Sequence, residues 1–183
     1  MRTLKILLFA LLILGGLFLQ LESRESKNSS DYQYFLVVKI DERRLYFYQL
    51  KNNEKKEIKN YPIAVPVLDS YLPLPLVGEI QKIELDPWWY PTEGTRLAYR
   101  QKKKIDLPKV IPPNHPLNAM GKAAFTVKFS NPDFKMPIRI HGTNDPQSIG
   151  QRITRGCIRL QNKDILELAQ IIKNTRTQVI IKK

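Results

Sequence analysis

The residues best suited to chemistry in this chain are its single cysteine, Cys157, and one of its two histidines, His141. A thiolate attacks acyl carbons, and a neutral imidazole can take the thiol proton near neutral pH, so the two form a candidate nucleophile–base pair. For such a pair we expect the Cys157 sulfur to lie within hydrogen-bonding range of a His141 ring nitrogen. The plainer interpretation is a buried, inert thiol and a histidine that only supports the scaffold. The residue types alone leave both interpretations open.

Both residues sit in segments with the alternation of a β-strand. Met136–His141 and Cys157–Leu160 each alternate apolar and polar residues. Because side chains alternate faces along a strand, burying the apolar set turns the histidine, the cysteine and Arg159 away from the core. The intervening Gly142–Gly156 is rich in Gly, Asn, Asp, Pro, Ser and Thr, which is typical of turns. This loop can therefore bring the two strand ends together.

Three short motifs occur in order along this stretch. They are His141-Gly142-Thr143, Ser148-Ile149-Gly150 and Thr154-Arg155-Gly156-Cys157-Ile158-Arg159. Together they resemble the signature of the L,D-transpeptidase (YkuD-like) family, in which an HGT segment and a Ser-x-Gly precede Ser-(His or Arg)-Gly-Cys-Ile-Arg. The resemblance covers the chain from about Tyr34 to its C-terminus.

The chain departs from the family pattern at three places. Thr154 stands where relatives usually have Ser, and it keeps the hydroxyl. Arg155 stands where many relatives have a His, which leaves His141 as the only reasonable base, and its guanidinium could favour the thiolate. Leu74–Gly78 replaces a Thr-Pro-Thr-Gly-like turn, which bears on substrate details more than on the chemistry.

The resemblance assigns roles to the remaining motif residues. Cys157 is the nucleophile and His141 the base, and the carbonyl of Gly142 orients the imidazole. The amides of Gly156 and Cys157 are natural oxyanion donors, because glycine lets the backbone approach the reacting carbonyl. Arg159 binds a substrate carboxylate or forms a surface ion pair, two alternatives that stay open. The other candidate substrate-binding residues are Thr154, Arg155 and Ser148.

The implied substrate is a peptidoglycan stem peptide that ends in a D-residue. Cys157 would attack the carbonyl of the diamino acid, release the terminal D-Ala and hold a thioester, which an amine from a second stem resolves as a 3–3 cross-link. Other acceptors are an outer-membrane lipoprotein, or water in a carboxypeptidase or hydrolase. A non-catalytic wall-binding module is the alternative from another class. No metal or cofactor is expected.

The N-terminus predicts export. Arg2 and Lys5 precede an apolar run over 6–21, which is typical of a signal peptide. A small-residue cleavage site is not evident, so residues 1–21 are either a signal peptide or an uncleaved membrane anchor. Residues 22–33 are polar and serine-rich and are expected to be a tether, and 34–183 form one catalytic domain. The protein is therefore expected in the periplasm or cell envelope, where a lone cysteine forms no internal disulfide.

Positive charge dominates the sequence. Thirty Lys and Arg against seventeen Asp and Glu give a net charge of +13. This favours an anionic wall or membrane surface as partner, whereas nucleic acid is not expected, because no nucleic-acid motif accompanies the charge. The basic cluster Arg100–Lys104 is expected to be a solvated loop.

The domain is predicted to be mainly β with minor helix, a β-sandwich or barrel-type architecture. A helix is expected from Asn162, the predicted N-cap, because Ile165, Leu168, Ala169 and Ile172 follow at helical spacing. Pro62 should confine its strand to an edge or leave it at a strand end. The expected strands are Tyr34–Ile40 and Arg44–Leu50 as a hairpin, then Lys56–Val65, Val77–Leu85, Ala123–Phe129 and Thr177–Ile181.

Two further features are assigned to structure. The aromatic and proline run Asp86–Pro91, which holds Trp88, Trp89 and Tyr90, is expected to pack as a rigid loop, although relatives carry a similar stretch that borders the donor cleft. His115 lies among prolines and is expected to be structural or exposed. It is not expected to act as the base.

Overall fold

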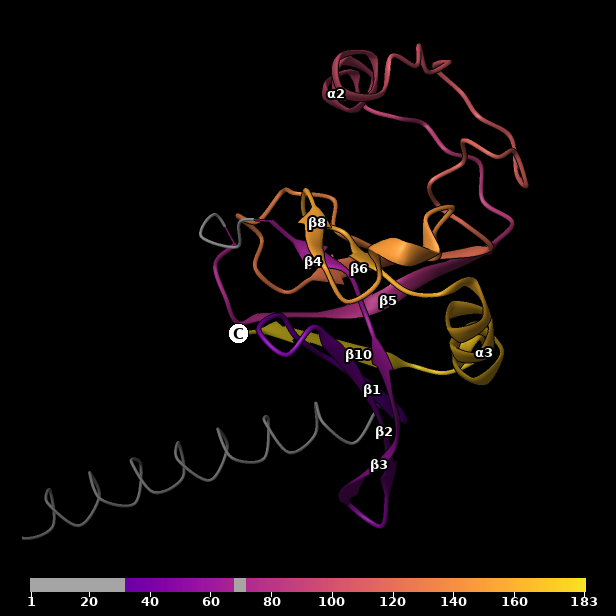
Figure 1. Ribbon diagram of the computed structural model, residues 1–183. Helices are drawn as coiled ribbons and strands as arrows, with labels where there is room; N and C mark the ends of the chain where they lie inside the picture. Colours follow the sequence, from indigo (N-terminus) through magenta and orange to yellow (C-terminus); the bar gives the residue numbers. More distant parts are fainter. Residues whose placement is uncertain (1–31, 68–71) are drawn as a thin grey trace, which may run out of the picture.

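The computed structural model describes residues 32–67 and 72–183 (Figure 1). The predicted signal peptide or anchor and most of the predicted tether lie outside these residues. The helices are α2 (Glu93–Lys103) and α3 (Asn162–Ile172), with a short 3-10 turn at Pro146–Ser148. The strands are β1 (Tyr34–Lys39), β2 (Arg44–Lys51), β3 (Glu54–Pro62), β4 (Val65–Pro66), β5 (Leu76–Leu85), β6 (Ala123–Phe129), β7 (Arg139–His141), β8 (Arg152–Thr154), β9 (Ile158–Arg159) and β10 (Thr177–Lys182).

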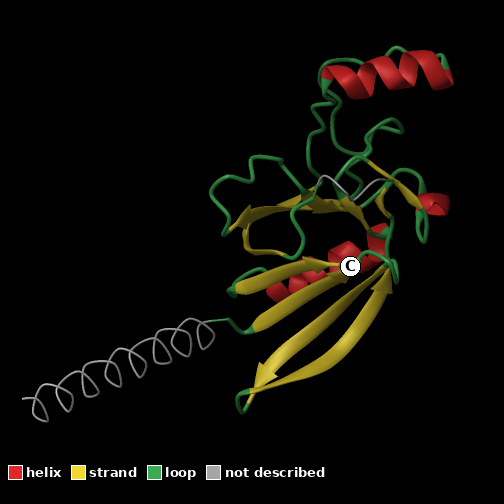
Figure 2. Ribbon diagram, turned by 90° about the vertical axis from the view of Figure 1, so that its left-hand side faces the viewer, coloured by secondary structure: helices red, strands yellow, loops and turns green. Residues whose placement is uncertain are grey.

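Eight of the strands form one sheet in the order β3-β2-β1-β10-β5-β6-β7-β9, and β4 pairs with β8 in a second. The predicted hairpin of β1 and β2 is present, and Pro62 ends the edge strand β3, as expected. The C-terminal β10 enters between β1 and β5, parallel to β1. Because the sheet curves strongly (Figure 2), its first and last strands lie in different planes. The mainly β fold class is confirmed.

One hydrophobic core lies against the curved sheet and is closed by α3 (Figure 1). The helix contributes Ile165, Leu168, Ala169 and Ile172, each at most 2% exposed, at the spacing that predicted it. Burying such an aliphatic side chain contributes about 2 kcal/mol. The core side of α3 therefore fixes the segment that leads out of β9.

An arm formed by residues 87–122 extends from the sheet and carries α2 (Figure 1). Trp89 packs there with Leu107, Ile111, Ala119 and Met120 in a second cluster, which reaches the sheet at Ala124 of β6. Trp88 and Tyr90 are exposed. The rigid-loop interpretation therefore holds for Trp89, and its two neighbours lie on the surface.

The expectation of a loop at Arg100–Lys104 was wrong, because all but the last of these residues belong to α2. Thr92 caps the helix by accepting a hydrogen bond from the Thr95 N–H, and Lys104 ends it in the left-handed conformation. No side chain of α2 is buried. Only Leu97, Ala98 and Tyr99 are apolar in this helix, so its sequence lacks the repeated apolar residues that located α3.

The N-cap expected at Asn162 was also misplaced. Gln161 occupies the cap position without a side-chain hydrogen bond. The Asn162 amide instead accepts hydrogen bonds from the N–H groups of Lys122 (3.1 Å) and Thr143 (3.0 Å) and donates to the Thr143 carbonyl (2.9 Å). Asn162 thus ties α3 to the end of the arm and to the residues after β7. Within residues 32–67 and 72–183, no helix is long and apolar enough to cross a membrane.

Candidate active site

Strand register places the candidate residues in two neighbouring rows on one face of the sheet. Paired residues on adjacent strands share a face. One row contains Glu84, Ala124, His141 and Arg159, and the next contains Thr126 and Arg139. Cys157 directly precedes Ile158, which pairs with the buried Ile140, so the alternation places the cysteine on the same face as Arg139. The structure therefore gathers three predicted residues, Cys157, His141 and Arg159, on one face.

His141 ends β7 and is only 2% exposed. It lies on the face of the sheet that points away from the main core, as the alternation of apolar and polar residues along this strand predicts. The histidine is nevertheless buried, because the arm covers this face with Ala119 and Met120, packed over Ala124. The sequence could not foresee this cover, since the arm is separated from β7 along the chain and carries no motif.

A hydrogen bond fixes the His141 ring. Nδ1 lies 2.7 Å from the Gly142 carbonyl oxygen, which can only accept, so Nδ1 carries the proton of the neutral ring and Nε2 holds the lone pair. Burial, together with the charges of Arg159 and Arg139, lowers the pKa of His141 to about 3, although hydrogen bonds to the backbone of Gly142 and Ala119 act in the opposite direction. The imidazole is therefore neutral at physiological pH, the state a general base requires.

Cys157 is partly exposed and free of disulfides. Burial raises the pKa of its thiol, while the backbone N–H of Arg139 and the charges of Arg159 and Arg139 partly offset that rise. Among the described residues no hydrogen bond joins Cys157 to His141. Direct thiol–imidazole contact therefore stays a prediction, and the resting pair is a neutral thiol beside a neutral imidazole.

The loop before Cys157 is held by Thr154. Its hydroxyl donates to the Cys157 carbonyl at 2.6 Å and accepts a long bond of 3.4 Å from the Gly156 N–H. Gly156 has a φ of +145°, and a Cβ there would lie 3.1 Å from the Met136 sulfur, so the loop requires glycine. The N–H of Cys157 makes no hydrogen bond among the described residues. It is the better placed of the two proposed oxyanion donors.

The other predicted substrate-binding residues lie in different surroundings. Ser148 and Thr154 are 2% and 4% exposed and donate to backbone carbonyls, so their role in substrate binding stays a prediction. Arg155 reaches across to α2, where its Nη1 lies 3.3 Å from the position a Cβ would take on Gly94. The expected help of Arg155 to the thiolate stays a prediction, and the charges that lower the pKa of Cys157 include those of Arg159 and Arg139.

Arg159 is positioned for an anion. Its backbone exchanges two hydrogen bonds with Ala64, at 2.9 and 3.0 Å, and register places it beside His141. Its Nε is buried without a hydrogen-bond partner in the part of the chain described, and no carboxylate there forms an ion pair with it. Of the two predicted alternatives, the surface ion pair is therefore disfavoured. A substrate carboxylate would satisfy the unpaired guanidinium.

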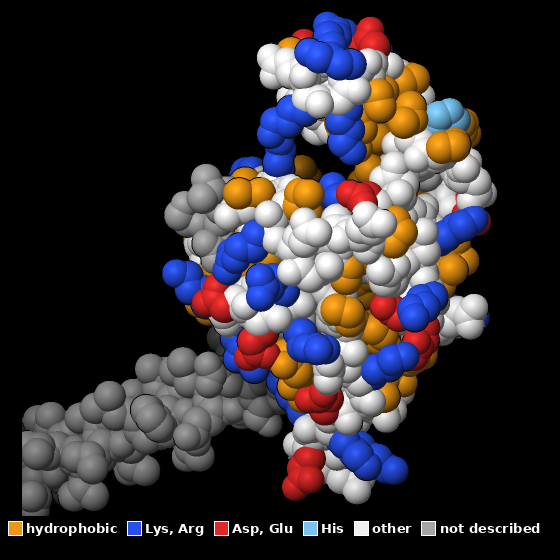
Figure 3. Space-filling model, in the orientation of Figure 1, with side chains coloured by type: hydrophobic (Ala, Val, Ile, Leu, Met, Phe, Trp, Pro, Cys, Tyr) orange, Lys and Arg blue, Asp and Glu red, His pale blue; other side chains and the backbone are white. Residues whose placement is uncertain are grey.

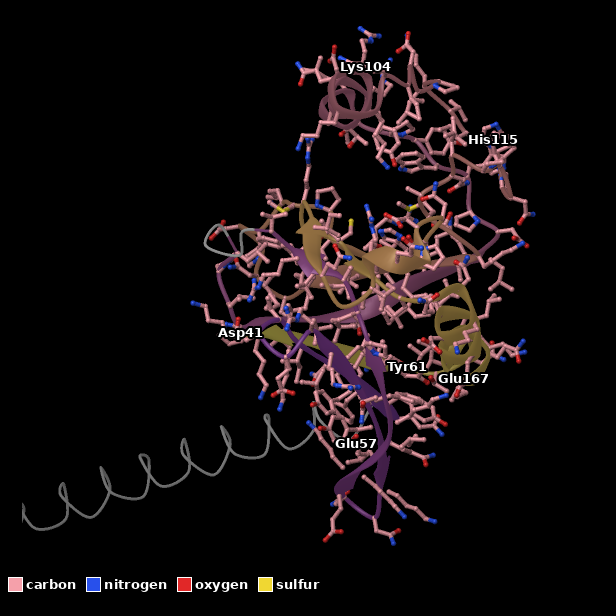
Figure 4. All side chains as sticks on the ribbon, viewed as in Figure 1. Asp41, Glu57, Tyr61, Lys104, His115 and Glu167 are labelled. Carbon is pink, nitrogen blue, oxygen red and sulfur yellow. The ribbon has the colours of Figure 1, made fainter. Side chains whose placement is uncertain are left out.

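Sequence reasoning missed two residues of this site. Arg139 lies next to Cys157 in the register but belongs to no motif, although its parity with His141 was visible. Asn162 holds Thr143 and packs against Gly142, where a Cβ would come within 2.3 Å of its Oδ1. His115, by contrast, lies on the arm and is exposed, as expected (Figure 4).

A hollow separates α2 from the sheet beneath it (Figure 3). The arm thus overhangs the face that carries Cys157 and His141, and Arg155 reaches from that face toward α2. An extended peptide could enter between the two.

Comparison with known proteins adds the family. A family model described as the L,D-transpeptidase catalytic domain (YkuD) matches residues 33–181. The chain is 34% identical over 146 residues to the probable L,D-transpeptidase ErfK/SrfK of Salmonella typhimurium, covering 79% of this chain and 43% of that protein. The chain therefore spans less than half the length of this curated relative.

Solved structures share the fold at low identity. Bd1075 of Bdellovibrio bacteriovorus matches with a TM-score of 0.56 and 21% identity over 84% of this chain and 49% of its own. L,D-transpeptidase 3 of Mycobacterium tuberculosis, solved with a faropenem-derived adduct, matches with a TM-score of 0.51 and 10% identity over 83% of this chain and 61% of its own.

Proposed function

Because the chain belongs to the YkuD family of L,D-transpeptidase catalytic domains, we propose that it is a cysteine-dependent L,D-transpeptidase acting on peptidoglycan stem peptides. The observation that carries this proposal is the shared face of Cys157, His141 and Arg159 on paired strands, with the His141 Nδ1 bound by the Gly142 carbonyl. A wall-binding module would have no need of an oriented neutral imidazole beside the only thiol.

The reaction begins from two neutral groups. The Cys157 sulfur attacks the carbonyl carbon of the diamino acid while its proton passes to Nε2 of His141. The negative charge that develops on the carbonyl oxygen is received by the N–H of Cys157, supported by that of Gly156. Collapse of the tetrahedral adduct breaks the bond to the terminal D-Ala, whose amine leaves with the proton from His141. A thioester remains on Cys157.

An amine of a second stem resolves the thioester. His141 takes a proton from the attacking amine and returns it to the departing sulfur, so the product is an amide and the free thiol is restored. The unpaired guanidinium of Arg159 holds a carboxylate of the donor stem during both steps. With a stem amine as acceptor the product is a 3–3 cross-link, with a lipoprotein amine it is a wall attachment, and with water it is a shortened stem.

The setting of the enzyme follows from its charge and its N-terminus. We propose that it works in the periplasm or cell envelope, exported by residues 1–21 or anchored by them. The net charge of +13 supports attraction to the anionic wall or to membrane headgroups.

The direct test uses the full-length chain in mild detergent. Incubation with a carbapenem, which acylates nucleophilic cysteines of this family, should add one ligand mass at Cys157, and Cys157→Ser should lose the adduct. Purified disaccharide-tetrapeptide should yield cross-linked dimers, or tripeptides if water is the acceptor, resolved by mass spectrometry.

The two histidines supply a matched control for that experiment. His141→Ala should nearly abolish acylation, because the thiol loses its base, and His115→Ala should leave most of it. No adduct on folded wild type would support the wall-binding alternative. An adduct away from Cys157 would refute the assigned site.

A further inference from the structure

A carboxylate and a guanidinium meet across the strand next to the active site. Glu84 of β5 forms an ion pair with Arg139 of β7, although β6 lies between them. Arg139 also reaches the Thr126 hydroxyl at 3.4 Å and the Met120 sulfur at 3.9 Å. The two charged side chains are only 28% and 27% exposed, so solvent screens them incompletely. Ala124, opposite both Glu84 and His141, is small enough to let the pair form over it.

The same Arg139 is the register neighbour of Cys157. The charged groups on the cysteine's side of the sheet include Arg155 in the loop before Cys157 and the exposed Lys128 of β6, which shares a face with Ala124 and Thr126. The others are Arg139 and His141 from β7, Arg159 from β9, and Lys82 and Glu84 from β5, where Lys82 lies 3.1 Å from Glu84. Lys82 is 64% exposed, so its effect at the thiol is the most strongly screened.

We propose that Glu84 and Arg139 are positioning residues that together set the electrostatic potential at Cys157. Arg139 supplies a positive charge that favours the thiolate, and Glu84 fixes that guanidinium over β6 and offsets part of its charge. Arg159 is thereby left to bind substrate, since its guanidinium has no carboxylate partner among the described residues. The inference rests on the proposed role of Cys157 as the nucleophile.

The ion pair predicts that the two substitutions shift the ionisation of the Cys157 thiol in opposite directions. A general loosening of the structure would not separate the two variants by sign. Removing the carboxylate in Glu84→Gln leaves the positive charge uncompensated, so the thiol should ionise at lower pH. Removing the guanidinium in Arg139→Met should have the opposite effect. The double variant should fall close to wild type, because both charges are gone.

The experiment measures alkylation of the full-length protein by iodoacetamide between about pH 6 and pH 10.5, where the rate follows the thiolate fraction. Cys157 is the only cysteine, so the label reports this site alone. We expect midpoint shifts of about 0.5 pH unit, downward for Glu84→Gln and upward for Arg139→Met, or about threefold in rate at neutral pH in opposite directions. Arg139→Lys keeps the charge and should stay near the wild-type midpoint.

A second ion pair of the same kind serves as the control. Asp41 and Arg152 of β8 lie 2.5 Å apart, and Asp41→Asn and Arg152→Met make the same changes of charge. Neither should move the midpoint. Shifts of Glu84→Gln and Arg139→Met in the same direction, or shifts no larger than these controls, would overturn the proposal. If Arg139→Met does not fold, the absence of a downward shift in Glu84→Gln overturns it alone.

Alkylation needs no peptide substrate, so its result is separate from the proposed function. Shifts of the expected sign without acyl transfer would count against the transpeptidase assignment only. Acyl transfer without these shifts would count against the roles of Glu84 and Arg139 only.

Discussion

At the scale of single residues, the protonation states of His141 and Cys157 decide how the reaction starts. Burial lowers the pKa of the imidazole and raises that of the thiol, so both shifts favour the neutral pair. The enzyme therefore does not rest as a thiolate–imidazolium pair. In the proposed mechanism the proton moves as the sulfur attacks, and the His141 ring, held by the Gly142 carbonyl, receives it.

The buried His141 also predicts a pH dependence of stability. Its pKa is about 3 in the folded chain against an ordinary value of 6.5, so the unfolded chain binds the extra proton between these values. Stability is therefore full above about pH 6.5 and falls as the pH decreases. Between pH 7 and pH 5 the loss from this residue should be about 2 kcal/mol.

Urea unfolding at the two pH values measures this loss. His141→Gln should reduce it, whereas His115→Gln should keep it, because His115 is exposed. Equal losses in wild type and His141→Gln would show that other groups cause the acid sensitivity.

At the scale of elements, short strands and the start of one helix hold the site. β7 and β9 are three and two residues long, too short to fix their own register, and α3 and the arm brace them. Asn162 is the point where these parts meet, since its amide binds Lys122 and Thr143. Asn162, the first residue of α3, thereby holds the segment that follows β7.

Replacing that amide should weaken both the fold and the site. Asn162→Ala leaves two N–H groups without their acceptor, at a cost of about 2 kcal/mol in the free energy of unfolding. Asn162→Asp keeps the acceptor oxygen and should cost less. Asn60→Ala removes exposed hydrogen bonds only and should change stability by less than about 0.5 kcal/mol. Chemical denaturation measures all three, and equal effects would contradict the bracing role.

At the scale of the whole molecule, positive charge is spread over the surface rather than confined to the site (Figure 3). The net charge is +13, and the last turn of α2 alone carries Arg100, Lys102 and Lys103. Such a distribution attracts an anionic polymer without selecting a sequence in it. In the proposed function, charge therefore draws the protein to the wall, and the face beneath the arm carries the reaction.

Salt should separate these two contributions. The Debye length falls from about 10 Å at 0.1 M to about 3 Å at 1 M ionic strength, so attraction to the wall should be screened. Activity on intact sacculi should decrease several-fold over this range, while activity on a small soluble stem peptide should change less. Parallel assays at each salt concentration give the ratio of activity on sacculi to activity on the soluble peptide. A ratio that does not change with salt would place the recognition in the active site alone.

The sequence by itself determined the elements with strong local signals. Alternation and β-branched residues located the β1–β2 hairpin, β6 and β10, and helical spacing located α3. These patterns are local, because each one records which side chains of a single element face the core. The order of His141, Gly156, Cys157 and Arg159 also pointed to the family, which the family model confirms, because a motif is a property of the sequence itself.

Tertiary structure decided what depends on contacts between distant segments. The arm buries His141 and sets its charge state, and Asn162 leaves the helix cap to hold Thr143. The charges of Arg159 and Arg139 lower the pKa of the Cys157 thiol. The helix α2 was not predicted because its sequence is mostly polar and charged, and none of its side chains enters the core. Burial, register and electrostatic distance are properties of the folded sheet, and residue spacing along the chain does not specify them.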